Sequence, residues 1–136
     1  MWDNRVLDVY QGKDSEAQKV VVYKRHGGRN QKWRIQYVDE AKKPQKGGLV
    51  GDFGFHANRP FYFRSRLPMQ RVMECIGANN IVLKRWVKNR TAQQFYFDPV
   101  SKTIRSQQWK NYAVEIQSNG GSANLRATST INSRWW

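Results

Sequence analysis

The chain has 136 residues, and its composition, 39% hydrophobic with six each of Trp, Tyr and Phe, favours one packed domain over disorder. Its 24 Lys and Arg residues against 10 Asp and Glu give a formal net charge of +14, an excess that an anionic partner would neutralise. No apolar run approaches the length that spans a membrane, and residues 1–5 lack the apolar core of a signal peptide, so we expect an intracellular, cytoplasmic protein.

Short apolar segments, rich in Val, Ile, Phe and Tyr, are separated by Gly, Asn, Lys and Ser along the whole chain, a pattern typical of β-strands. We expect one helical turn at most, within residues 12–18. The stretch 39–58 is longer than an ordinary connection and reads as a basic insertion. In chain order the pattern predicts strands at 5–10, 19–23, 33–38, 60–65, 72–76, 80–84, 95–98, 103–106, 113–117 and 124–127.

Three parts of the chain repeat one another. Each pairs an apolar–acidic–apolar strand with an aromatic residue that follows a polar cluster, at spacings of 26, 22 and 21 residues. A unit of this length cannot bury its own apolar face, so three copies must share a core. We therefore expect the three aromatic residues, Trp33, Phe95 and Trp135, to meet around a pseudo-threefold axis.

The first strand of each repeat carries its acid between two apolar residues. Because side chains alternate along a strand, Leu7 and Val9 share one face and Asp8 lies on the other, which we expect to face outward. The same holds for Glu74 and Glu115. Cys75, the only cysteine, excludes an intrachain disulfide, and we interpret it as a buried strand thiol.

These residues resemble the ricin B-type β-trefoil family, which is built from three four-strand units that each carry a Gln-x-Trp signature. Gln31-Lys32-Trp33 matches the signature in full. Gln93-Gln94-Phe95 has Phe in place of Trp, and Ser133-Arg134-Trp135 lacks the Gln. The resemblance implies an all-β fold, a β-trefoil of three imperfect repeats in a single domain, 1–136.

The implied repeats are 4–38, 60–102 and 103–136, with the insertion at 39–58 between the first two. The chain leaves no room for the first strand of repeat one or the last strand of repeat three. We therefore expect the trefoil to lack these two strands and to be part of a longer polypeptide that supplies them, since their absence would expose sheet edges.

In sugar-binding members of the family, a pocket uses the acid of the first strand, an aromatic platform and the Asn before the signature. Repeat one matches with Asp8, Tyr23 and Asn30, and Gln31 lies beside them. A carboxylate and an amide suit paired sugar hydroxyls, and a ring covers the apolar face of a sugar. The resemblance thus implies a carbohydrate site in repeat one, although the same residues could serve the scaffold alone.

The other two repeats depart from this pattern. Repeat two has Ala92 where Asn is expected and Lys84 or Arg85 near the platform position. Repeat three keeps Glu115 and Asn132 but has Leu125 or Arg126 at the platform. We expect at most one pocket.

The favoured interpretation is a non-catalytic structural or docking subunit whose basic surface binds an acidic protein within a larger assembly. A functional carbohydrate-binding lectin and a nucleic-acid-binding module are the alternatives. In a nucleic-acid-binding module, the Lys and Arg side chains would bind phosphate groups and the bases would stack on exposed Tyr62 and Trp86. The expected contacts with an acidic partner are Lys42, Lys43, Lys46, Arg64, Arg66, Lys84, Arg85, Lys88 and Arg90.

Catalysis finds little support in the sequence. His26 lies in a Gly-rich loop and His56 in the insertion, and neither belongs to a pattern with a nucleophile or metal-ligand spacing. We predict that the protein is no enzyme and has no cofactor, metal site or membrane insertion.

Overall fold

The computed structural model describes residues 5–39, 49–50, 55–76, 80–109, 113–117 and 123–128. The described residues form antiparallel strands and three single 3-10 turns, η1 (Tyr10–Gly12), η2 (Arg29–Gln31) and η3 (Thr91–Gln93), without an α-helix. The strands are β1 (Arg5–Val9), β2 (Gln18–Lys24), β3 (Trp33–Tyr37), β4 (Leu49–Val50), β5 (Phe55–His56), β6 (Phe61–Ser65), β7 (Val72–Ile76), β8 (Asn80–Lys84), β9 (Phe95–Asp98), β10 (Thr103–Ser106), β11 (Ala113–Gln117) and β12 (Ala123–Thr128).

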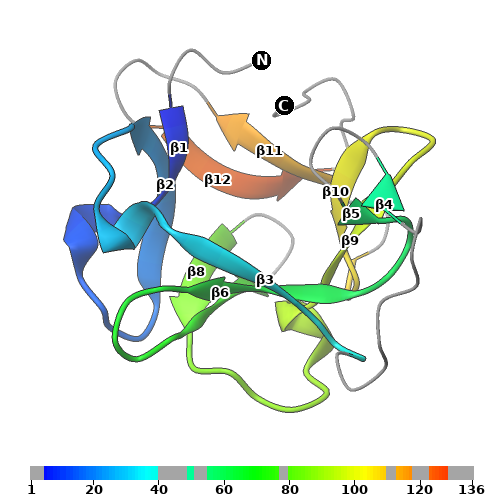
Figure 1. Cartoon of the computed structure of the whole chain (residues 1–136), viewed down its shortest axis with the longest axis horizontal. Coiled ribbons are helices and arrows are strands. Elements are labelled where there is room, and N and C mark those ends of the chain that lie inside the picture. The colour runs from blue at the N-terminus through cyan, green and yellow to red at the C-terminus, as the bar shows by residue number, and fades with distance from the viewer. Residues whose placement is uncertain are drawn as a thin grey trace.

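All ten strands expected from the sequence are present, within two residues at each end. Three of them begin hairpins, β1–β2, β7–β8 and β11–β12, and the second strand of the first hairpin pairs with those of the other two. The strands β3, β6, β9 and β10 pair in series and join the hairpin units. Figure 1 shows these elements arranged in a ring around the centre of the molecule. This is the expected β-trefoil arrangement.

A single hydrophobic cluster receives residues from all three repeats. Leu7 and Val9 on β1, Met73 and Cys75 on β7, and Val114 on β11 belong to it. Each comes from the apolar face of a first strand, so the threefold pattern in the sequence is a threefold pattern in the core. Burying apolar area at about 25 cal/mol per Å² is the main term that stabilises such a shared centre.

Two of the three signature aromatics can be placed. Phe95 is fully buried in the shared cluster, and Trp33 packs against the same cluster while its indole N–H donates to the Leu7 carbonyl at 3.2 Å. Trp135 lies outside the described residues. The two rings therefore meet the expectation of a common core.

The expectation that the strand acids face outward is wrong. Asp8 is 3% exposed and Glu74 is 4% exposed. Alternation does place each on the face opposite the core residues, but the turn that follows the hairpin folds over that face and covers the carboxylate. The side chain of Glu115 lies outside the described residues.

Three further expectations need correction. The insertion is not wholly irregular, since β4 pairs with β5 and Ala57 bridges to Phe97. His56 ends β5, is 9% exposed and packs its ring edge-on against Tyr37, with 5.0 Å between centroids. Tyr62 is buried, not free, and the Trp86 ring packs edge-on against it. The structure has three 3-10 turns where one helical turn at most was expected, and η1 overlaps the predicted range 12–18 only at Gly12.

Candidate functional site

In repeat one, the buried carboxylate of Asp8 is held by the signature glutamine. Gln31 on η2 donates from Nε2 to Asp8 Oδ2 at 2.8 Å and to the Lys24 carbonyl at 2.8 Å. Its Oε1 accepts the backbone N–H groups of His26 and Gly27. One side chain thus ties β1, the end of β2 and the following loop together. We call this arrangement the glutamine bracket.

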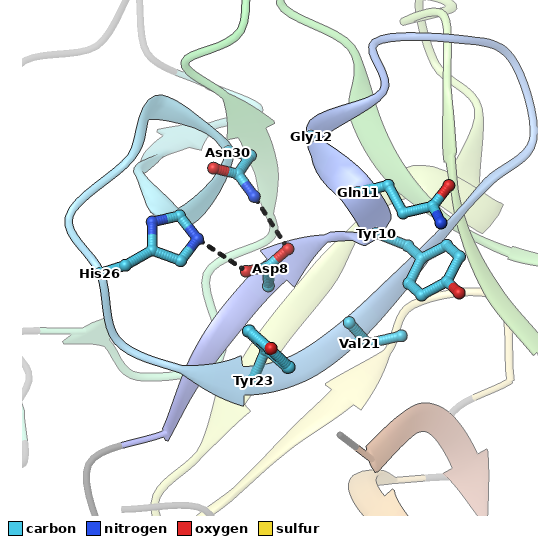
Figure 2. Close-up of a pocket in the computed structure, with 8 residues that line it drawn as sticks. All are labelled: Asp8, Tyr10, Gln11, Gly12, Val21, Tyr23, His26 and Asn30. Carbon is cyan, nitrogen blue, oxygen red and sulfur yellow. Dashed lines mark hydrogen bonds and ion pairs between the residues drawn. The ribbon is translucent and has the colours of Figure 1, made fainter. Parts of the chain in front are cut away.

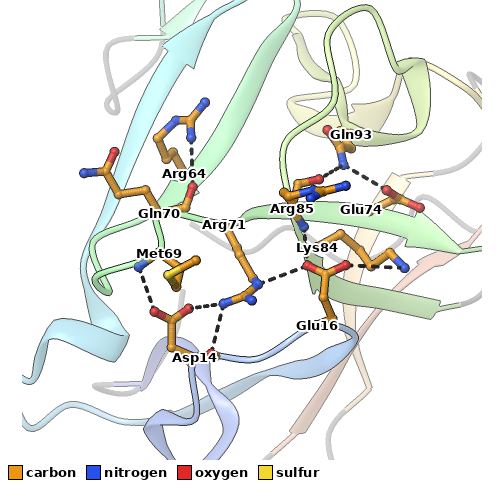
Figure 3. A network of polar contacts seen from close by, with 10 residues as sticks. All are labelled: Asp14, Glu16, Arg64, Met69, Gln70, Arg71, Glu74, Lys84, Arg85 and Gln93. Carbon is orange, nitrogen blue, oxygen red and sulfur yellow. Dashed lines mark hydrogen bonds and ion pairs between the residues drawn. The ribbon is translucent and has the colours of Figure 1, made fainter.

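Repeat two contains the same bracket. Gln93 Nε2 donates to Glu74 Oε1 at 2.9 Å and to the Arg85 carbonyl at 2.7 Å (Figure 3). Its Oε1 accepts a hydrogen bond from the Val87 N–H at 2.9 Å. Gln93 is fully buried, whereas Gln31 is half-buried. The glutamine of the signature therefore positions the acid and the loop, and Gln31, expected as a sugar contact, lies behind Asp8 and does not line the pocket described next.

The register of β1 and β2 builds the floor of a pocket in repeat one. Asp8 is paired with Val21, and Val6 with Tyr23, so Asp8, Val21 and Tyr23 share one face of the hairpin. Figure 2 shows Asp8 at the centre, between Asn30 and His26 on one side and Tyr23 on the other. This repeat-one pocket has a volume of about 450 Å³ and is lined by Asp8, Tyr10, Gln11, Gly12, Val21, Tyr23, His26 and Asn30.

The Asp8 carboxylate is oriented by donors from the loop before β3. Asn30 Nδ2 lies 2.9 Å from Asp8 Oδ1, and His26 Nε2 lies 3.6 Å from Oδ2. The Gly28 N–H donates to His26 Nδ1 at 3.1 Å, which places the proton of the neutral ring on Nε2, toward Asp8. A carboxylate offers about four acceptor positions, so lone pairs remain for hydroxyl donors in the pocket.

Two glycines allow this wall to form. A Cβ at Gly28 would lie 2.7 Å from Asn30 Oδ1 and 2.7 Å from His26 Cε1, so any larger residue would displace both side chains. Gly12 has φ +65°, a left-handed conformation that glycine adopts without strain, and it lines the pocket beside Asn30. Neither glycine was among the site residues expected from the sequence.

Four more lining residues were missed by the sequence reasoning. Tyr10 and Gln11 come from η1, Val21 from β2 and His26 from the loop after β2. Tyr10 and Tyr23 are 40% and 46% exposed, so each presents part of its ring to solvent. His26 stood in a Gly-rich loop five residues before the signature glutamine, and that proximity was the available signal.

The corresponding place in repeat two is occupied by a cation. A cavity of about 490 Å³ borders Glu74, but Arg90 Nε lies 3.0 Å from Glu74 Oε1. The register Val72↔Lys84 puts Lys84, not Arg85, at the position that Tyr23 has in repeat one. With Ala92 before the signature, this repeat has neither the amide nor the aromatic ring of the repeat-one pocket.

Repeat three has the same strand register with a different residue at the platform position. Glu115 is paired with Arg126, and Ala113 with Thr128, so Thr128 holds the platform position, in place of the expected Leu125 or Arg126. Asn132 lies outside the described residues.

The cations expected to bind an acidic partner fall into distinct groups. Arg90 is paired with Glu74, and Lys84 Nζ lies 3.9 Å from Glu16. Arg64 donates to Gln36 Oε1 and to the Gln70 carbonyl, at 2.5 and 2.8 Å. Arg66, Arg85 and Lys88 are exposed. Lys42, Lys43 and Lys46 lie outside the described residues.

A polar network joins repeat one to repeat two beside these cations. Arg71 donates to Asp14 Oδ1 at 2.9 Å and to Glu16 Oε1 at 3.0 Å (Figure 3). Burial would raise the pKa of Glu16, but the donors Arg71 and the Arg85 N–H, together with Lys84, hold that pKa below its ordinary value. Burial alone would likewise lower the pKa of Arg71, and its two carboxylate partners raise it overall.

Cys75 is buried, as expected for a strand thiol. Burial raises the pKa of Cys75 to about 12, against a smaller opposing effect of its hydrogen bond with Ser106. Within the described ranges, no group of three or more His, Cys, Asp or Glu side chains gathers as metal ligands would. The described part of the chain also contains no helix long and apolar enough to cross a membrane.

Known structures share this fold. The chain is similar to the designed threefold-symmetric protein ThreeFoil, with a TM-score of 0.70 and 16% identity over 95% of this chain and 84% of that one. It is similar to the cytolethal distending toxin of Actinobacillus actinomycetemcomitans, with a TM-score of 0.65 and 16% identity over 96% and 76%. The β-trefoil lectin of the Vibrio vulnificus hemolysin/cytolysin, solved with N-acetyl-D-lactosamine bound, has a TM-score of 0.59 and 20% identity over 93% and 77%.

No protein-family model and no curated protein matches the chain. The structural similarities, all at low identity, establish the class: the chain is a β-trefoil protein.

Proposed function

We propose that the chain is a non-catalytic, ricin B-type carbohydrate-binding module with one working pocket, in repeat one. The observation that carries the proposal is the Asp8 carboxylate, which is fixed by Asn30 and Gln31 and borders a cavity beside the exposed ring of Tyr23. Repeat two has the same bracket, but Arg90 neutralises its acid.

The pocket supplies both kinds of contact that a sugar needs. Asp8 accepts a hydrogen bond from one sugar hydroxyl group, and the carbonyl oxygen of Asn30 accepts one from a neighbouring hydroxyl group while its amide group remains bound to Asp8. Tyr23 or Tyr10 covers the apolar face of the ring. A single site of this kind binds in the millimolar range, about −4 kcal/mol, and gains useful strength through multivalency.

The test is a glycan array followed by titration calorimetry with the glycan that binds best. Asp8→Ala should abolish binding. Glu74→Ala is the matched control, because it removes the equivalent bracketed carboxylate from a repeat without the platform and the Asn. Tyr23→Ala, at a position 46% exposed, removes the platform without disturbing the core and should weaken binding about tenfold, or about 1.4 kcal/mol.

If folded Asp8→Ala and Tyr23→Ala bind the glycan as the wild type does, the pocket is not the site. If no glycan on the array binds the folded wild-type chain, the carbohydrate function is wrong.

A docking role on an acidic protein is the second candidate function, favoured by the exposed cations Arg66, Arg85 and Lys88. A pulldown from lysate at low salt with wild-type chain and an Arg85→Gln/Lys88→Gln variant tests it. Recovery of the same acidic protein by both would exclude these two cations as the docking contacts, and recovery of none would exclude the role.

A further inference from the structure

A second cavity, of about 700 Å³, lies where repeat one meets repeat two, along the paired strands β3 and β6. Among the described residues that line it, five are cationic and none is acidic. We call it the cationic groove. Its lining residues are Arg29, Lys32, Arg34, Arg64, Ser65, Arg66 and Gln70.

The groove concentrates positive charge that the fold itself brings together. The β3–β6 register places Arg34 directly opposite Arg64, although like charges in this position destabilise an antiparallel pair. Arg64 donates to the Gln70 carbonyl (Figure 3) and to Gln36 Oε1, and these two bonds fix its guanidinium at this edge. Arg29, Lys32 and Arg66 are exposed at the groove and can reach a ligand.

The groove and the repeat-one pocket share a wall. Arg29 and Asn30 are consecutive residues of η2, and in a 3-10 turn successive side chains point about 120° apart. Arg29 lines the groove, and Asn30 lines the pocket. Arg29 Nη2 also donates to the Arg66 carbonyl at 3.0 Å, which fixes the turn against the loop after β6. One ligand of two or more sugar units can therefore meet both cavities.

We propose that the cationic groove binds sulfate groups of a sulfated glycan whose neutral sugar occupies the repeat-one pocket. The second half of this statement rests on the proposed function, and the anion site stands on the groove alone. Guanidinium groups form bidentate, charge-assisted hydrogen bonds with tetrahedral oxyanions, and several of them converge here. Multiple sulfates match a groove of five cations better than a single carboxylate does.

The described lining favours a glycan over a nucleic acid. Binding of a single strand combines cations with aromatic side chains on which bases stack, and no described residue of the lining is aromatic. The nearby Trp86 ring packs edge-on against Tyr62, at 6.1 Å between centroids, and faces the Arg64 guanidinium at 5.7 Å. A hollow beside a sugar pocket also suits a chain of sugars better than the broad surface of an acidic protein.

The first experiment uses inorganic sulfate as the probe and measures the thermal midpoint of the whole chain in sodium sulfate and in sodium chloride at equal ionic strength. Sulfate should raise the midpoint of the wild type and of Asp8→Ala. It should not raise that of Lys32→Gln/Arg66→Gln. The control Lys13→Gln/Lys102→Gln removes the same charge from exposed positions that do not line the groove and should respond as the wild type does.

The second experiment titrates a heparin-derived tetrasaccharide and its desulfated form. The sulfated form should bind at least about tenfold more tightly, or about 1.4 kcal/mol, and the groove variant should lose this difference while the control retains it. Equal affinity for the two forms would overturn the proposal, and so would tighter binding of oligothymidylate or polyglutamate through the same two residues. Asp8→Ala separates the carbohydrate pocket from the anion site. If Asp8→Ala leaves binding of the neutral glycan intact, the proposed function fails. A sulfate effect that is lost only in the groove variant still supports the anion site in that case.

Discussion

Replacement of the two bracket glutamines by alanine should destabilise the protein to very different degrees. Gln93 is fully buried, and its three hydrogen bonds join Glu74, the Arg85 carbonyl and the Val87 N–H. Gln93→Ala leaves the Glu74 carboxylate without its partner in a buried position, and the Arg85 carbonyl and the Val87 N–H without theirs in partly buried ones. At about 1 kcal/mol for each neutral bond, and more for the bond to a carboxylate, the free energy of unfolding should fall by about 3 to 4 kcal/mol.

Gln31 makes more hydrogen bonds than Gln93, yet its removal should cost less. Its bonds to His26, Gly27 and Lys24 are exposed, so water replaces the lost partner there. Only the bond to Asp8 is partly buried, and we expect a loss of about 1.5 kcal/mol for Gln31→Ala. Urea unfolding followed by tryptophan fluorescence measures both values, and thermal midpoints should fall by about 4 °C for each kcal/mol.

The comparison is decisive because the two variants remove the same side chain from equivalent positions of two repeats. If Gln31→Ala lowers the free energy of unfolding as much as Gln93→Ala does, burial does not control the strength of the bracket. An unchanged denaturant slope is required for the comparison, since a changed slope would mean that the unfolded state had changed as well.

Three other predictions concern the surroundings of the site. The pKa of Glu16 in the folded state lies below its unfolded value, so the stability that Glu16 contributes is present above the ordinary glutamate pKa, about 4.3, and is lost as pH falls through the lower folded value. Arg71→Gln removes one cause of this shift and should weaken the pH dependence of urea unfolding below pH 5. An unchanged pH dependence would contradict the network. Cys75, with a pKa of about 12 and no exposure, should react with a thiol reagent at pH 8 only after unfolding, and rapid labelling of the native protein would contradict its burial. Gly28→Ala should displace the Asn30 amide and weaken glycan binding with a thermal midpoint close to that of the wild type, and full binding by this variant would show that the wall does not depend on glycine.

The sequence predicted the strands well because each has a short apolar run with alternation that marks its two faces. It did not predict burial on the second face. Asp8 and Glu74 were expected to be exposed, since alternation says which way a side chain points and not what folds over it. The covering element in each case is a 3-10 turn placed by a long-range glutamine bond, and Gln31 and Gln93 are 23 and 19 residues away from the acids that they hold.

The site was predictable only in part, for a related reason. Asp8, Tyr23 and Asn30 could be chosen because a family resemblance supplied their roles, and the structure brings all three to one pocket. The same pocket is also lined by Tyr10, Gln11 and His26, which come from loops whose paths depend on tertiary contacts. Examples are the hydrogen bonds that Gln31 Oε1 accepts from two backbone N–H groups of the loop. Pairing of Arg90 with Glu74 was also missed, because a cation in a polar loop appears in the sequence as a surface charge.

The two repeats that can be compared show how a trefoil assigns different tasks to equivalent positions. Both keep a buried acid, a glutamine bracket and a 3-10 turn, which the fold needs in order to close each loop on its hairpin. What differs is the residue just before the glutamine and the residue beside the acid on the second strand. Asn30 and Tyr23 leave the acid of repeat one available to a ligand, whereas repeat two has Ala92 and Lys84 at these two positions and its acid is paired with Arg90. Because a few side chains outside the bracket make this difference, stability and binding can vary separately, and the matched pair Asp8→Ala and Glu74→Ala is able to separate them.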